Sequence, residues 1–160
     1  MAQTLSPIIT HLSSHPDMMT ITAVDAFATP RHLAGVRKAV IAPIVAALAQ
    51  QHATPLLIVV AHTDEAVRLC EDLHHWLPGY PVYHFVANDT IPYEPMSPSV
   101  ESTAARLRAL HAMTARERCI VVAPIRAVLQ PTQVTLLNKN PVLSLLAIKF
   151  SKRMLYIAIR

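Results

Sequence analysis

Glycine is scarce in this sequence, with two in 160 residues. A phosphate-binding loop, G-x-x-x-x-G-K-[ST], needs glycines for its backbone, a lysine for the phosphate oxygens and a hydroxyl for magnesium. Counting from Gly35, these three later positions hold Val40, Ile41 and Ala42. The sequence therefore predicts no ATP or magnesium site at this position. A G-x-S-x-G nucleophile motif is absent as well, which argues against that class of hydrolase.

Long apolar runs are also missing. The longest, residues 39–49, is interrupted by Pro43 and falls short of the roughly 20 residues that cross a membrane. We therefore expect a buried helix there. Residues 1–14 lack a basic region followed by an apolar one, so no signal peptide is expected. Cys70 and Cys119 lie in apolar stretches, which predicts reduced core thiols in a cytoplasmic protein.

Basic residues outnumber acidic ones by 14 to 10, but the excess is confined to one end of the chain. Without that end, the body has nine basic and ten acidic residues, a net charge of −1, so we expect no DNA-binding face on it. The apolar, basic segment is expected to fill part of a sheet or stay loose, with binding to an anionic membrane as a weaker alternative. Its five cations are Lys139, Lys149, Lys152, Arg153 and Arg160.

Three short apolar runs, residues 55–61, 82–86 and 119–123, are bounded by prolines, glycine or polar residues. Continuous apolar runs of this length are typical of strands that are buried on both faces. Helical periodicity lies between and around them. Strands that alternate with helices predict an α/β fold, a parallel sheet flanked by helices and connected by right-handed crossovers.

Two helix starts are marked in the sequence. Thr63 is predicted to cap a helix whose first turn contains Asp64 and Glu65, where acids favour the helix dipole. This capping role is preferred over a magnesium site, because a magnesium-binding acid would lie at the strand end. Ser99 is predicted to cap a helix to about Thr114, with Val100, Leu107 and Leu110 on one face.

A family resemblance emerges in residues 30–133. Asp89-Thr90, Pro92-Tyr93-Glu94, Ser97-Pro98 and Arg106-Leu107 with Leu110 occur in order, after a matching stretch at 55–80. This arrangement resembles the N-terminal segment of transcription-repair coupling factors, which is built like the nucleotide-binding domain of UvrB. The tyrosine-rich hairpin of UvrB itself is missing, which favours the coupling factors.

The resemblance implies a degenerate P-loop NTPase or helicase-like fold similar to UvrB domain 1, with a vestigial phosphate loop at Gly35, Val40, Ile41 and Ala42. It implies a lead-in at 1–30, a UvrB-like α/β domain at 31–133 and a divergent basic apolar tail at 134–160. The family pattern stops near residue 133, so we expect a truncated or frameshifted copy, or equally an artefact of genome assembly.

The intact family is an ATP-dependent DNA translocase that displaces stalled RNA polymerase and recruits UvrA in transcription-coupled nucleotide excision repair. Its ATP- and magnesium-dependent motor lies downstream. For this chain the resemblance implies a cytoplasmic, non-catalytic module without a cofactor, whose partners would be UvrA and neighbouring domains. RNA polymerase and DNA would be reached only through domains that do not fit in 160 residues.

The residues Pro92, Tyr93, Glu94, Arg106 and Arg108 form a possible interaction surface. An aromatic side chain on a loop is typical of interfaces, although a merely packed loop is equally compatible. For Arg106 and Arg108, a solvated helix face is the simpler interpretation. The more specific interpretation is that they help to dock neighbouring domains.

Three alternatives stay open from the sequence. Cys70 and His74 share a helix face, but zinc usually needs four ligands, so a core cysteine beside a surface histidine is favoured. The chain could also be a nucleotide-dependent helicase-like ATPase. A third hypothesis is a stand-alone α/β binding protein that shares only the fold.

Overall fold

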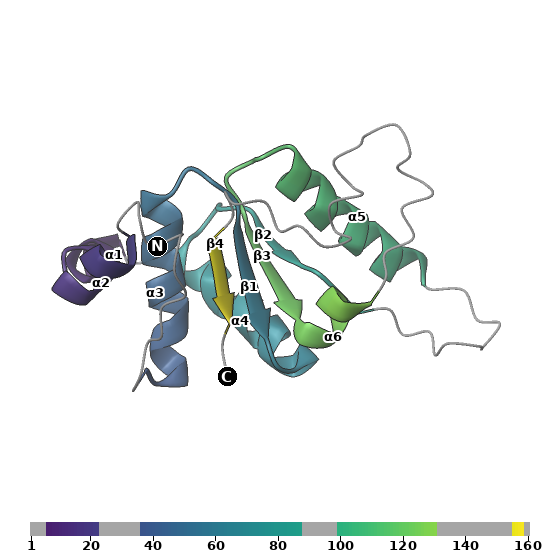
Figure 1. Ribbon diagram of the computed structural model, residues 1–160, viewed down its shortest axis with the longest axis horizontal. Helices are drawn as coiled ribbons and strands as arrows, with labels where there is room; N and C mark the ends of the chain where they lie inside the picture. Colours follow the sequence, from purple (N-terminus) through teal and green to yellow (C-terminus); the bar gives the residue numbers. More distant parts are fainter. Residues whose placement is uncertain (1–5, 23–35, 88–98, 131–154, 159–160) are drawn as a thin grey trace.

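The computed structural model describes residues 6–22, 36–87, 99–130 and 155–158 (Figure 1). None of the helices in these ranges is long and apolar enough to cross a bilayer. The predicted Pro92-Tyr93-Glu94 loop and Gly35 lie outside the described residues.

A parallel sheet forms the centre of the molecule. Its strands are β1 (Leu56–Val60), β2 (Val82–His84), β3 (Ile120–Pro124) and β4 (Leu155–Ala158), in the order β2-β3-β1-β4. Every pairing is parallel, and Ile58 of β1 lies opposite Val122 of β3 and Ile157 of β4. The predicted α/β class and parallel sheet are confirmed.

Helices cover both faces of this sheet (Figure 1). On one face lie α1 (Ser6–Ser13), α2 (Pro16–Thr22), α3 (Lys38–Gln51) and α4 (Thr63–Trp76). On the other face lie α5 (Val100–Thr114) and α6 (Ile125–Leu129). The result is a three-layer α/β/α arrangement.

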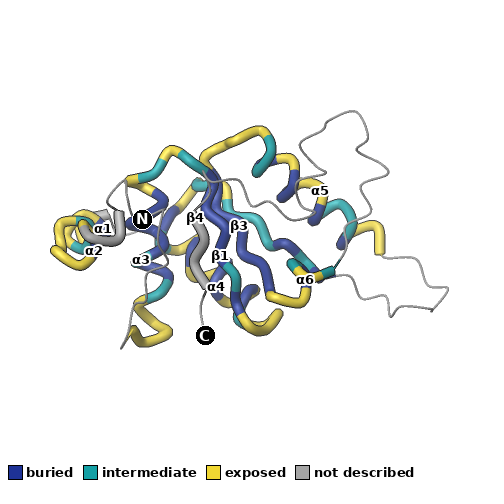
Figure 2. Tube along the Cα trace, viewed as in Figure 1, coloured by how far each residue is buried: buried dark blue, intermediate teal, exposed yellow. Residues whose placement is uncertain are grey.

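The two apolar cores follow from the alternation of side chains along β1. Leu56 and Ile58 belong to the core beneath α3 and α4, whereas Leu57 belongs to the core beneath α5. Figure 2 shows buried backbone along β1 and β3, with exposed segments at the ends of the helices. A strand buried on both faces needs the continuous apolar sequence that β1 and β3 have.

Helix α3 packs closely because its inner face is made of small side chains. Ala46, Ala47 and Ala49 are fully buried, together with Val45 and Leu48. Pro43 lies inside the helix and is also buried. The predicted buried helix is therefore confirmed.

One predicted helix cap is wrong by a residue. His62, in extended conformation, is the N-cap of α4 and makes no side-chain capping bond, while Thr63 is already helical. The amide of Ala66 donates to the carbonyl of His62, which fixes the first turn one residue earlier than the side-chain pattern suggested. Asp64 and Glu65 do lie in the first turn, as predicted.

Helix α5 begins as predicted, but its buried face differs. The Ser99 hydroxyl accepts a hydrogen bond from the Ser102 amide at 3.1 Å. Val100 is 84% exposed, so the predicted grouping of Val100 and Leu107 with buried Leu110 is wrong. The buried side of α5 is formed instead by Ser102, Arg106, Ala109, Leu110 and Ala112.

Both cysteines are buried and free, which confirms the predicted core thiols. Burial raises the pKa of Cys70 to about 12 and that of Cys119 to about 11, so neither thiol ionises readily.

Strand β4 comes from the segment predicted as a divergent tail. It pairs with β1 along residues 56–59, so this part of the segment fills one edge of the sheet, which is one of the two outcomes expected for it. The predicted domain boundaries at 30 and 133 stay predictions.

Candidate functional site

Ligands in open parallel sheets commonly bind at the carboxyl ends of the strands, where helix N-termini gather. At this edge α4 begins three residues after β1, and α6 begins directly after β3. The N-terminus of α3 lies at the same edge, because the Lys38 ammonium bonds to the Glu65 carboxylate of α4 at 2.6 Å. The vestigial phosphate loop would lie here.

The described residues of the predicted loop lie in a helix. Val40, Ile41 and Ala42 lie in the first turns of α3, with Val40 41% exposed, Ile41 half-buried and Ala42 buried. None of these side chains can bond a phosphate oxygen or a metal. The positions predicted for the loop therefore offer neither the lysine nor the hydroxyl that a phosphate loop needs.

Lys38, the first residue of α3, forms a hydrogen-bonded ion pair with Glu65. This hydrogen bond is the main cause that lowers the pKa of Glu65 below its ordinary value. Asp64 adjoins Glu65 at the same helix start. Acidic side chains there disfavour a phosphate, because the positive end of the helix dipole is already compensated.

A second region links α5 to the end of β2. The Arg106 guanidinium donates to the Val86 carbonyl at 2.7 Å and lies 4.2 Å from the centre of the Phe85 ring. Arg106 is 4% exposed, and burial lowers its pKa below its ordinary value. The solvated-face interpretation is therefore wrong for Arg106, because a long cationic side chain can be buried where a carbonyl and a ring face receive it.

Arg108 differs from Arg106 although both are on α5. It is exposed, and its Nε donates to the Ala104 carbonyl at 3.3 Å within the same helix. Of the predicted surface, Arg108 is thus the one described residue that is accessible. Pro92, Tyr93 and Glu94 lie outside the described residues, so their role stays a prediction.

Both ends of the 88–98 segment adjoin contacts made by α5. Arg106 holds Val86 before the segment, and the Ser99 cap begins α5 directly after it. The helix that the resemblance singled out therefore fixes the chain on both sides of the Pro-Tyr-Glu motif.

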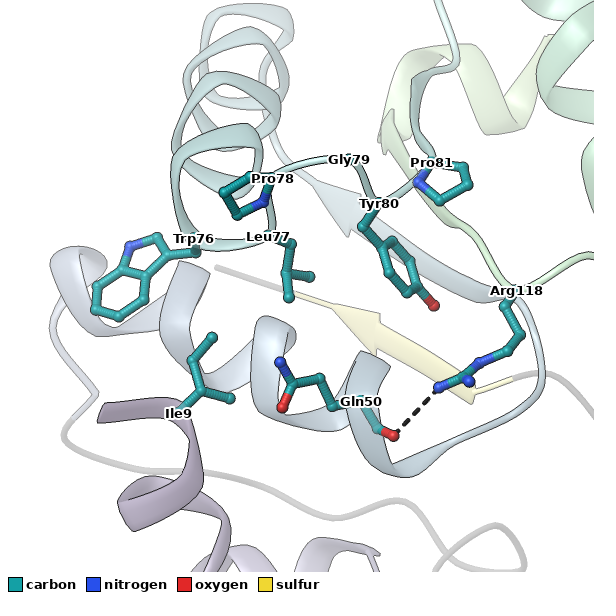
Figure 3. A pocket seen from close by; sticks show the side chains of 9 residues that line it. All are labelled: Ile9, Gln50, Trp76, Leu77, Pro78, Gly79, Tyr80, Pro81 and Arg118. Atoms are coloured by element: carbon teal, nitrogen blue, oxygen red, sulfur yellow. Dashed lines mark hydrogen bonds between the residues drawn. The ribbon is translucent and has the colours of Figure 1, made fainter. Parts of the chain in front are cut away.

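The amino edge of the sheet carries a feature that the sequence did not predict. A depression of about 490 Å³ lies where α3 and α4 end and β2 and β3 begin. Figure 3 shows Trp76 and Tyr80 on either side of it, with Leu77 between them. The aromatic residues that flank the Pro78-Gly79 turn were the one sequence signal for this site.

No metal centre is apparent among the residues that the structure describes, since no three His, Cys, Asp or Glu side chains gather there. Nδ1 of His74 lies 2.6 Å from the Cys70 carbonyl oxygen, so this ring bonds to its own helix.

No family model matches the chain. The sequence is similar to the transcription-repair-coupling factor of Escherichia coli (strain K12), with 25% identity over 89 residues. These residues make up 56% of this chain and 8% of the coupling factor. The chain thus has a distant, partial relation to a coupling factor and spans less than a tenth of its length.

Proposed function

We propose that this chain is a non-catalytic module in DNA repair, which resembles the UvrB-like N-terminal part of transcription-repair coupling factors and acts by binding another protein. The similarity to a coupling factor supports the relation to DNA repair. The ordered run of motifs at 88–110, with Pro92-Tyr93-Glu94 at its centre, supports the finer placement.

The observation that carries the non-catalytic role is the structure of the α3 N-terminus. The residues at the predicted loop positions lie in a helix, and their apolar side chains cannot bind a phosphate or a metal ion. The neighbouring Lys38 is paired with Glu65. A phosphate would meet the Lys38–Glu65 ion pair and the carboxylate of Asp64 here. Nucleotide binding would need an exposed backbone cradle and an unpaired lysine.

The nucleotide arm of the proposal is tested by thermal unfolding with and without millimolar Mg-ATP. A ligand that binds only the folded chain must raise the unfolding midpoint, so we expect no rise. Glu65→Gln should also show none, because releasing Lys38 does not restore a lysine at Ile41. A rise of several degrees in the unmodified chain would favour the helicase-like ATPase instead.

The second part of the proposal concerns the partner protein, UvrA, which the intact coupling factors recruit. We propose that the surface formed by Pro92, Tyr93, Glu94 and Arg108 contacts UvrA. Arg106 is buried and is not part of this contact surface, but it bonds to Val86 shortly before the Pro-Tyr-Glu motif.

Titration calorimetry of the purified chain with UvrA tests this arm. Tyr93→Ala and Arg108→Glu should each weaken binding about tenfold or more, since aromatic and arginine side chains dominate interface energies. Arg68→Glu is the matched control, because Arg68 is exposed on α4 across the sheet. Equal losses for all three, or no binding of UvrA, would refute this surface while leaving the non-catalytic role intact.

A further inference from the structure

The depression at the amino edge is built from rigid, mostly apolar side chains. Its floor contains Ile9 and Leu77, which are buried, and its walls carry the aromatic rings of Trp76 and Tyr80. The complete lining adds Gln50, Pro78, Gly79, Pro81 and Arg118. Rings, prolines and a helix end lose little conformational freedom on binding, which favours association.

Arg118 supplies the only formal charge among the nine described lining residues. Its Nη2 donates to the carbonyls of Ala49 at 3.3 Å and Gln50 at 3.2 Å, at the end of α3, and the second contact is drawn in Figure 3. The Tyr80 hydroxyl donates to the same Ala49 carbonyl at 3.4 Å. These contacts hold an exposed guanidinium in place before any ligand arrives.

The guanidinium still has donors beyond these two bonds, since arginine carries five N–H groups. A carboxylate is the partner that matches such a planar, fixed group. A phosphate fits less well, because α3 and α4 end here and the negative ends of their dipoles, which oppose any anion, oppose a doubly charged phosphate more than a singly charged carboxylate.

The shape of the depression favours a peptide over a small cofactor. It is open to solvent, whereas small ligands are usually enclosed. Grooves lined by aromatic side chains and prolines bind extended or proline-bearing peptides.

We propose that this depression, formed by Trp76, Leu77, Tyr80 and Arg118, binds an extended peptide segment of a partner protein that carries an apolar residue next to an Asp or Glu. The apolar residue lies between Trp76 and Tyr80, and the carboxylate bonds to Arg118. The site is at the edge of the sheet opposite the Lys38–Glu65 pair, and none of its lining residues belongs to the proposed UvrA surface.

A displayed library of random nonapeptides, selected on the full chain, tests the proposal. The selected sequences should be enriched in an apolar residue within about three positions of an acid. Trp76 is the one tryptophan of the chain, so titration with a tryptophan-free selected peptide should change its fluorescence and saturate. No enrichment, enrichment of basic peptides, or binding that leaves Trp76 fluorescence unchanged would overturn the site.

Arg118→Gln should weaken the selected peptide at least tenfold, whereas Arg126→Gln, which removes an exposed cation on α6, should leave binding unchanged. Because Arg118 also caps α3, folding of the variant is checked by circular dichroism. Changing the peptide's Asp or Glu to its amide leaves the chain intact and should cause the same loss. Undiminished binding of the amide peptide would refute the role of Arg118.

Discussion

Arg106 is the one buried charged side chain in the part of the chain that the structure describes. It is buried against Phe85 and bonded to the Val86 carbonyl, whereas Arg108, two residues further along the same helix, is exposed. A buried cation is tolerated only when such partners replace water. Arg106 therefore fixes the end of β2 relative to α5.

We predict that Arg106→Ala lowers the free energy of unfolding by about 2 kcal/mol, because the part-buried carbonyl of Val86 loses its donor and a cavity forms. Arg108→Ala should change it by less than about 0.5 kcal/mol, as is usual for an exposed position. Urea unfolding of both variants measures the difference. Similar losses for the two would show that Arg106 is not buried as described.

His84 gives the protein a pH dependence. Its Nε2 is buried without a hydrogen-bond partner, and burial lowers its pKa below the ordinary value of 6.5. Burial lowers the pKa of His52 as well. The unfolded chain then binds protons more readily than the folded one, so stability is complete above pH 6.5 and falls as pH drops below it.

We therefore expect the unfolding free energy to decrease from pH 7.5 to 5.5, with a slope of at most about 1.4 kcal/mol per pH unit for each such histidine. His84→Gln should reduce that slope. His75→Gln, which removes an exposed imidazole on α4, is the control. Urea unfolding at several pH values gives the slopes, and an unchanged slope in His84→Gln would contradict the assignment.

At the scale of elements, α5 depends on its N-terminal cap. The Ser99 hydroxyl receives the Ser102 amide and also contacts the Ser102 hydroxyl at 2.9 Å. This cap satisfies a helix-end amide that would otherwise lack a partner. It also sets where α5 begins after the Pro-Tyr-Glu motif.

Ser99→Ala should reduce stability by about 1 kcal/mol, and Ser99→Asp should retain most of it, because an aspartate accepts the same bond. Thermal and urea unfolding compare the two variants. If Ser99→Asp were as damaging as Ser99→Ala, the cap would not be the source of the effect.

For the whole molecule, the pairing of β4 with β1 decides whether β1 is an edge strand or an inner strand of the sheet. The ladder joins residues 155–158 to residues 56–59, across about a hundred residues of sequence. An unpaired apolar strand at this position would be an aggregation hazard. The pairing with β4 makes β1 an inner strand, so β1 no longer presents an unpaired edge.

Successive amides of a strand point in opposite directions, so either Tyr156→Pro or Ile157→Pro must remove a bond to β1. We expect one of the two variants, and not the other, to speed hydrogen exchange of the amides in residues 56–59. Exchange of β3 should change less. Unchanged exchange of residues 56–59 in both variants would show that β4 does not pair there.

The sequence predicted β1, β2 and β3, most helix positions and the Ser99 cap, because apolar runs, breakers and capping side chains act over a few neighbouring residues. The prediction that no phosphate loop forms is equally local, since it rests on the residue types at Val40, Ile41 and Ala42, and it stays a prediction. The sequence mispredicted the face of α5, because periodicity alone did not show that Arg106 would find partners on β2.

Other features depend on contacts between residues far apart in the sequence, and only the tertiary structure decided them. The Lys38–Glu65 pair joins two helices, Arg118 joins the start of β3 to the end of α3, and β4 joins the far end of the chain to β1. No local propensity encodes such pairs, because their energy appears only after the sheet has brought the partners together. The aromatic depression beside Arg118 is another feature that depends on such tertiary contacts.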